Sequence, residues 1–175
     1  MLEHARNRVP DGEFHLAGLE RLPLPADHVD LAVCGLALVH LTDLRPAFAE
    51  LARVLRPGGH LVVTDVHRDI VELGSVPHVR TADGDPRLLP QHPHRISDYL
   101  GAALPQGLEL RRCEEPRPKT SGAAPADEPL ALGPPSPWDT WPWSLMAMTP
   151  AATRAAWGGA PGVLLLHFQK RAITG

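Results

Sequence analysis

Asp65 and His67 are the side chains whose types and positions most directly suggest chemistry. Both come at the end of an apolar run, HLVVTDV at residues 60–66, that is typical of a buried strand. Ligands of α/β proteins bind beyond the carboxyl ends of parallel strands, and a histidine there can accept a proton. The sequence leaves two readings of Asp65 open: it contacts a ligand, or it caps the segment that follows.

The tightest histidine cluster is His92-Pro93-His94, close to Asp98. It has neither the i, i+4 helical spacing nor the cysteine pairs of ordinary zinc sites. We therefore predict a solvated loop there and no metal site. The only cysteines, Cys34 and Cys113, lack CxxC spacing, so a disulfide framework is not expected and a reducing cytoplasm is the predicted location.

The composition is ordinary for a soluble globular protein, with 43% hydrophobic and 21% charged residues over 175 positions. The net charge is -3 and no stretch concentrates Lys or Arg, which argues against nucleic acid or an anionic membrane as partner. The longest apolar run, residues 31–39, is too short to span a bilayer, and the N-terminus carries charges where a signal peptide needs an apolar core. The 20 prolines and the bias toward Arg fit a bacterial genome rich in GC.

The elements that must position these residues are a strand, a helix and a second strand. Residues 29–34 (VDLAVC) predict a parallel strand covered on both faces. A helix follows, capped by Thr42 and ended by the Pro-Gly-Gly at 57–59. Its apolar stripe consists of Leu44, Phe48, Leu51 and Leu55. With the strand at residues 60–66, this order predicts a right-handed crossover and a parallel sheet.

The rest of the chain predicts one domain over residues 1–175 with weaker elements. Residues 13–17 (EFHLA) predict a short strand and residues 67–94 an irregular segment. Then come a short helix at 98–104 capped by Ser97, a strand at 108–113, a Pro-rich excursion at 114–143, a helix near 150–157 and a last strand at 162–170. Three tryptophans lie at the end of the excursion, and they either tether it to the domain or line an acceptor pocket: Trp138, Trp141 and Trp143.

Residues 17–66 closely resemble the middle of small-molecule class I S-adenosylmethionine-dependent methyltransferases of the type 11 kind. Their pattern of Leu-Pro-Phe, Phe-Asp-Leu-Val, a His-Leu pair and Arg-Val-Leu-Lys-Pro-Gly-Gly is matched here in order and spacing. The matching strings are LPL at 22–24, VDLA at 29–32, HL at 40–41 and RVLRPGG at 53–59. The resemblance implies a Rossmann-like, mostly parallel sheet with flanking helices and an antiparallel last strand, and methyl transfer to an O, N or C atom of a small molecule.

The resemblance also implies where S-adenosylmethionine and the acceptor would lie. The adenine-facing strand end of the family falls at Gly18 and Leu19, where Gly18 replaces the usual carboxylate. The methionine part of the cofactor would lie beside Cys34, Gly35 and Leu36. Acceptor and methyl group would meet near His40. If the acceptor must lose a proton, His40 and His67 are the candidate bases.

The family's first two strands, with their glycine-rich turn and ribose-binding carboxylate, have no counterpart in this sequence. We therefore expect an N-terminally truncated domain whose 29–34 strand is a sheet edge with unpaired backbone groups. Either residues 13–17 move in beside that edge, or the chain forms a homodimer through it, or the chain is poorly soluble alone. The alternative function is a non-catalytic methyltransferase-like partner subunit, or a chain without activity.

Overall fold

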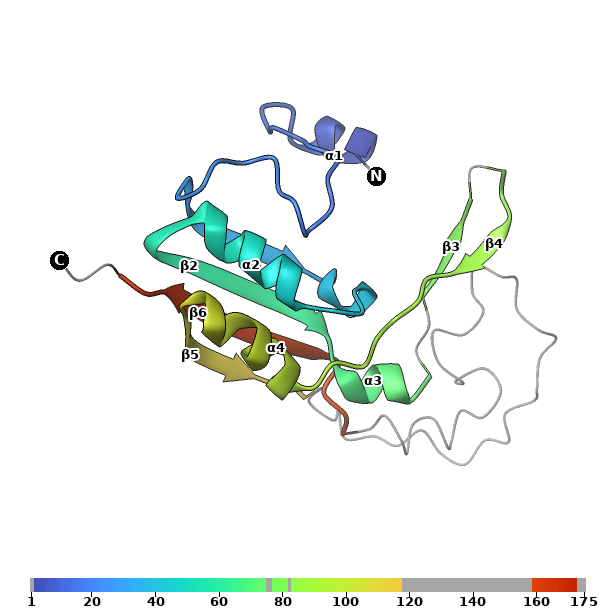
Figure 1. Cartoon of the computed structure of the whole chain (residues 1–175). Coiled ribbons are helices and arrows are strands. Elements are labelled where there is room, and N and C mark those ends of the chain that lie inside the picture. The colour runs from blue at the N-terminus through green and yellow to red at the C-terminus, as the bar shows by residue number, and fades with distance from the viewer. Residues whose placement is uncertain (1, 75–76, 82, 118–158, 173–175) are drawn as a thin grey trace.

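Four strands form one sheet in the order β1-β2-β6-β5. The computed structural model describes residues 2–74, 77–81, 83–117 and 159–172. Strand β1 (Val29–Gly35) pairs in parallel with β2 (Leu55–Val66), and β6 (Val163–Lys170) runs antiparallel between β2 and β5 (Leu108–Glu114). Three of the four strands therefore point the same way and the last strand opposes them, as predicted (Figure 1).

The crossover between β1 and β2 is the helix α2 (Arg45–Val54), with Pro46 in its first turn. The prediction of a Thr42 cap is wrong: Leu44 is the N-cap residue and makes no side-chain cap, while the Asp43 carboxylate accepts a hydrogen bond from the Arg45 amide at 3.0 Å. The helix ends at Val54, before the predicted Pro-Gly-Gly at 57–59, which lies within β2. Gly58, with φ +82°, lies where the β1–β2 register shifts, a conformation that only glycine adopts freely.

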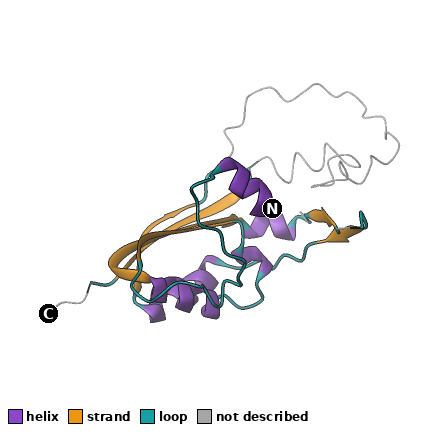
Figure 2. Ribbon diagram, turned by 90° about the horizontal axis from the view of Figure 1, so that it is seen from above, coloured by secondary structure: helices purple, strands orange, loops and turns teal. Residues whose placement is uncertain are grey.

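Helices α2 and α4 (Ile96–Ala103) lie together on one face of the sheet (Figures 1 and 2). The predicted stripe is buried there, with Phe48 and Leu51 on α2, Leu44 directly before the helix and Leu55 as the first residue of β2. Phe48 makes edge-to-face contacts with Tyr99 of α4 and Phe168 of β6, at ring-centroid distances of 6.4 and 5.9 Å. Helix, sheet and second helix therefore meet at one aromatic cluster.

The opposite face of the sheet is open at β1, contrary to the prediction of a strand covered on both faces. Leu31 is 57% exposed and Val33 is 68% exposed, whereas Cys34 on the helix side is buried. Because side chains alternate along a strand, the run VDLAVC divides into a buried and an exposed set. The apolar residues of the run predicted the strand correctly but not its environment.

The N-terminal segment begins with helix α1 (Leu2–Arg8), which is followed by a turn closed by a hydrogen bond from the Gly12 amide to the Val9 carbonyl at 3.0 Å. Residues 13–17 do not form the predicted strand and do not pair with β1. The chain is instead attached further along, where the Leu22 amide donates to Glu50 and the Arg53 guanidinium donates to the carbonyls of Leu22 and Leu24. These bonds to α2 replace strand pairing.

Residues 67–94 are more ordered than predicted. They contain the helix α3 (Arg68–Glu72) and a small hairpin of β3 (His78–Arg80) and β4 (Pro86–Leu88). A short 3-10 helix η1 (Leu38–His40) follows β1, and η2 (Leu104–Gln106) follows α4. Helix α4 is capped by the Asp98 carboxylate, which accepts from the Arg95 amide at 2.7 Å, and not by Ser97 as predicted.

Most of the predicted excursion, its three tryptophans and the predicted helix at 150–157 lie outside the described residues. No helix within the described part of the chain is long and apolar enough to cross a membrane.

The aromatic cluster predicts a strong effect of Phe48→Ala. Phe48 is fully buried, and removing a buried phenylalanine ring leaves a cavity that costs about 3–5 kcal/mol of unfolding free energy. Urea unfolding followed by circular dichroism measures the loss. Leu16→Ala is the control: its side chain is 92% exposed, so the free energy of unfolding should change by less than about 0.5 kcal/mol.

Candidate functional site

The carboxyl ends of β1, β2 and β5 share one edge of the sheet, because these strands are mutually parallel. Gly35 ends β1, His67 directly follows β2, and Glu115 directly follows β5. The structure therefore brings the residues predicted at the ends of two strands to the same edge. In open α/β sheets this edge is where ligands bind.

Leu36 has a φ of +53°, in the left-handed region that leucine rarely adopts. Its amide donates to the Thr64 carbonyl at 2.7 Å, which holds the turn, and its side chain is 53% exposed. A Cβ atom added to the neighbouring Gly35 would meet only the Thr64 Oγ1, at 3.6 Å. The end of β1 is thus a strained, uncrowded backbone step, and strain of this kind clusters at ligand sites.

Cys34, the third residue predicted at this step, is buried on the helix side of β1. Burial, with a smaller effect of the Asp65 carboxylate, raises the pKa of the Cys34 thiol to about 11. The thiol therefore stays protonated and packs in the core. Only the backbone of Cys34 could contact a ligand.

Gly18 and Leu19 lie in a turn closed by a hydrogen bond from the Arg21 amide to the Gly18 carbonyl, at 3.2 Å. Leu19 packs against the core, and Gly18 is exposed. A Cβ atom on Gly18 would lie 2.6 Å from Glu20 Oε2, so the Glu20 carboxylate folds back over this glycine. A carboxylate therefore does lie beside Gly18, supplied from two residues further on.

Asp65 is fully buried, and its hydrogen bonds connect three elements of the fold; we call this arrangement the Asp65 tie. Asp65 therefore has neither of its two predicted roles, ligand contact or cap. Its Oδ2 accepts from the Tyr99 hydroxyl at 2.8 Å and its Oδ1 from the Val66 amide at 3.0 Å. Burial raises the pKa of the Asp65 carboxyl, and these bonds together with one from the Val39 amide offset part of that rise. Asp65 joins β2 to α4 and to η1.

His67 caps α3: its Nδ1 accepts from the Asp69 amide at 3.1 Å. Its Nε2 lies 2.7 Å from Glu115 Oε1. A ring nitrogen that accepts from an amide carries no proton, so neutral His67 bears its proton on Nε2 and donates it to Glu115. Both nitrogens of His67 are thereby engaged, and one oxygen of the half-exposed Glu115 carboxylate is oriented by the imidazole.

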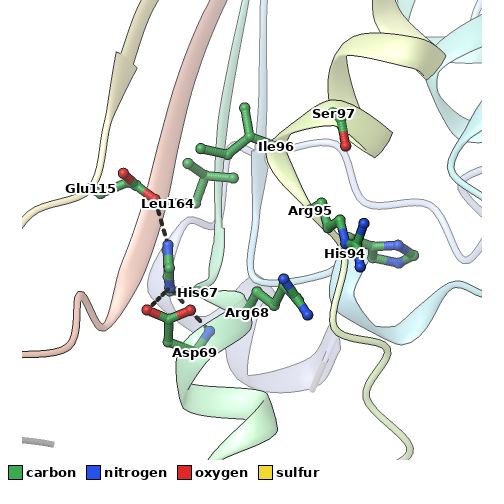
Figure 3. Close-up of a pocket in the computed structure, with 9 residues that line it drawn as sticks. All are labelled: His67, Arg68, Asp69, His94, Arg95, Ile96, Ser97, Glu115 and Leu164. Atoms are coloured by element: carbon green, nitrogen blue, oxygen red, sulfur yellow. Dashed lines mark hydrogen bonds and ion pairs between the residues drawn. The ribbon is translucent and has the colours of Figure 1, made fainter.

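A pocket of about 340 Å³ opens beside His67. Figure 3 draws its lining, with Glu115 and Asp69 bonded to His67 at one side and residues of the 94–97 segment at the other. The lining residues are His67, Arg68, Asp69, His94, Arg95, Ile96, Ser97, Glu115 and Leu164. Its two apolar members, Ile96 and Leu164, and its charged rim suit a small polar ligand.

His40 lies in η1, between the step at Leu36 and the loop before α4. Its Nδ1 lies 2.7 Å from the Pro90 carbonyl oxygen, which can only accept, so Nδ1 carries the proton. Nε2 then holds a lone pair and has no hydrogen-bond partner among the described residues. Of the two predicted bases, His40 is the one with a nitrogen available.

The histidine cluster at 92–94 has structural partners. His94 Nε2 donates to the Leu41 carbonyl at 2.7 Å, and the His92 amide donates to the Val39 carbonyl at 2.7 Å. Asp98 caps α4. Within the residues that the structure describes, no three His, Cys, Asp or Glu side chains gather as a metal site would require.

Known proteins are similar to this chain in sequence and in fold. Residues 1–63 match the family model of the methyltransferase domain. Malonyl-[acyl-carrier protein] O-methyltransferase of Salmonella typhimurium is 40% identical over 82 residues, which cover 47% of this chain and 31% of the relative. The ubiquinone/menaquinone biosynthesis C-methyltransferase UbiE of Francisella tularensis subsp. novicida is 36% identical over 97 residues, covering 55% and 34%. The matched segments thus span about a third of these relatives.

A solved structure, the S-adenosylmethionine dependent methyltransferase from Mesorhizobium loti, superposes on this chain with a TM-score of 0.62 at 21% identity. The superposition covers 97% of this chain and 76% of the other. At this identity the likeness establishes the Rossmann-like fold, as predicted from the sequence.

The Asp65 tie predicts that Tyr99→Phe lowers the free energy of unfolding by about 1–3 kcal/mol at pH 7, because a buried carboxylate loses its hydroxyl donor. The folded-state pKa of Asp65 is raised, so its contribution to stability is largest below its usual value of 3.8 and is lost as pH rises through the folded pKa. The variant raises that pKa further, so its deficit should grow from pH 4 to pH 7.

Urea unfolding of both proteins across this range measures the deficit. In Asp65→Asn, which cannot ionise, the effect of adding Tyr99→Phe should not depend on pH. If Tyr99→Phe lowers the free energy of unfolding by the same amount at every pH while Asp65 is present, the proposed role of the Tyr99–Asp65 hydrogen bond is wrong.

Proposed function

Because this chain resembles class I S-adenosylmethionine-dependent methyltransferases in the sequence of residues 1–63 and in its fold, we propose that it binds S-adenosylmethionine. It then takes part in methyl transfer to an O, N or C atom of a small molecule. The observation that carries the proposal is the strained, uncrowded step at Gly35 and Leu36, which lies at the carboxyl end of β1. The activity is proposed for this chain within a longer or assembled protein.

The residues at the step suit the methionine end of this cofactor. Gly35 lets a ligand approach the backbone closely, and the exposed Leu36 offers an apolar contact. The turn at Gly18 and Leu19, with Glu20 folded over it, would face the adenine. The described residues contain no glycine-rich turn between a strand and a helix, so contacts to the ribose are outside this proposal.

The acceptor would occupy the pocket beside His67. This pocket lies at the ends of β2 and β5, which are one and three strands away from β1 in the sheet order. Neighbouring strands are about 4.8 Å apart, so a ligand there lies on the order of 10 Å from the step. The reacting atoms must approach to about 3–3.5 Å, so cofactor and acceptor must each extend into the space between, and holding them aligned supplies most of the rate gain for such a displacement.

Two groups could take a proton from an acceptor, His40 through Nε2 and Glu115 through its second oxygen. When bound, the cofactor supplies a methyl group that is attached to a positively charged sulfur. The sulfur, as a neutral thioether, is a good leaving group. The chain's own task is then to orient the acceptor and to receive its proton. In this proposal His67 is a positioning residue, because both of its nitrogens are engaged.

The exposed side of β1 supports the second candidate, a non-catalytic methyltransferase-like subunit. Leu31 and Val33 are exposed there, as expected of a surface that a partner covers. This candidate predicts a stable complex without cofactor binding by this chain.

Calorimetric titration of the full chain with S-adenosylhomocysteine tests the proposal. We expect saturable one-to-one binding, and Gly35→Val should weaken it by at least about tenfold, or 1.4 kcal/mol, by placing a branched side chain over the step. The control is Gly101→Ala on α4, where an added Cβ meets nothing within 4 Å, and it should bind like the parent.

Unchanged unfolding of Gly35→Val would confine its effect to the ligand. Absence of heat with the parent chain at millimolar ligand would exclude independent cofactor binding and favour the subunit. If the parent and Gly35→Val bind S-adenosylhomocysteine with equal affinity, the step at Gly35 and Leu36 is not part of the binding site.

A further inference from the structure

His60 and His167 form a pair of imidazoles outside the site described above. His60 Nδ1 lies 3.0 Å from His167 Nε2, and the ring centroids are 5.1 Å apart. The two residues belong to neighbouring strands, with His60 opposite Gln169 and His167 opposite Val62, so they are diagonal neighbours across the β2–β6 ladder. Paired backbone therefore holds both rings in place.

Both rings lie on the sheet face away from α2 and α4. The residues that alternate with them, Leu61, Val63 and Leu166, are buried against the helices. His60 and His167 are themselves half-buried, which limits their rotamers and still leaves them reachable from solvent. A ligand could therefore approach the pair from the open face.

We propose that this pair binds a late transition-metal dication, with His60 Nδ1 and His167 Nε2 as its two protein ligands and water at the other positions. Neutral imidazole is a preferred ligand of copper, nickel and zinc. The arrangement offers two such ligands without loop closure, since the sheet is already formed.

The spacing of the two nitrogens is compatible with two neighbouring positions on one metal ion. Metal–imidazole bonds of about 2.0–2.1 Å, with the nitrogens 3.0 Å apart, subtend an angle of about 94° at the metal. A tetrahedral ion would hold the nitrogens about 3.3 Å apart. The present spacing is thus close to that of adjacent ligands in a tetragonal Cu²⁺ or Ni²⁺ site, and Cu²⁺ binds such ligands most tightly among the divalent ions.

Ligation requires both facing nitrogens to present a lone pair. The present contact requires one ring to donate a proton and the other to accept it. A metal needs the lone pairs of both facing nitrogens, and the donor ring supplies its own by moving the proton to its other nitrogen. Binding thus competes with a single hydrogen bond.

The charges around the pair do not oppose a cation. Arg112, opposite His167 in the ladder, is ion-paired with Glu114, and Leu31 lies opposite His60. Arg111 donates to the Gln169 side chain and to Glu109. Both arginines next to the pair therefore have their charge offset by a carboxylate.

Titration of the full chain with CuCl₂ and NiCl₂ near neutral pH, by calorimetry, tests the proposal. We expect one-to-one binding, tighter for Cu²⁺ than for Ni²⁺, with Zn²⁺ weaker than Cu²⁺. His60→Gln and His167→Gln should each weaken Ni²⁺ binding by at least about tenfold, because each removes one of two ligands. Ni²⁺ should also raise the Tm of the parent and not of these variants.

His92→Gln is the matched control, since His92 belongs to another close histidine pair, with His94 at a centroid distance of 6.3 Å. It should bind Ni²⁺ like the parent. In nitrogen-15 spectra recorded with substoichiometric Cu²⁺, the imidazole signals of His60 and His167 should broaden first, because the ion is paramagnetic. Equal Ni²⁺ affinity in the parent and in both folded glutamine variants, absence of saturable binding, or first broadening at other histidines would overturn the proposal.

Discussion

The bond between the Tyr99 hydroxyl and the Asp65 carboxylate connects the parts of this structure that matter for a ligand. Asp65 ends the apolar part of β2, Tyr99 belongs to α4, and the Val39 amide of η1 also donates to the carboxylate. Because burying a carboxylate without hydrogen bonds would cost free energy, these donors are needed to stabilise it inside the core. They fix η1, with His40, and the start of α4 relative to the strand that leads into His67. The geometry of the edge follows from that constraint.

The parts that could be predicted from the sequence are those governed by local periodicity. The spacing of Leu44, Phe48, Leu51 and Leu55 predicted one helical stripe, and all four are buried. The run at residues 29–34 predicted β1 but not the exposure of Val33, because an apolar run carries no information on what packs against it. Residues 13–17 alternate weakly and find no partner, since α2 binds the neighbouring segment through Glu50 and Arg53.

The candidate site shows the same division. The resemblance to known methyltransferases located Gly35, Leu36 and His40, and the end of a predicted strand located His67; the structure brings the ends of both strands to the same edge. The positive φ of Leu36 has no sequence signal, because leucine does not favour it and only the bond to Thr64 reveals why it holds. Glu115 was missed for a related reason: it lies 48 positions from His67, and only the pairing of β5 with β6 brings it near.

The strand order has a consequence for how the chain can be assembled during synthesis. β6, the last strand, lies between β2 and β5, so neither of these can complete its pairing until residues 163–170 have left the ribosome. β5 ends at Glu114 and β6 begins at Val163, so the closing step joins segments far apart in the chain. The entropic cost of such closure grows only slowly with length, yet the delay leaves earlier strands unpaired meanwhile. Until residues 163–170 are synthesised, β2 and β5 therefore each keep an unpaired edge, which favours pairing with other chains.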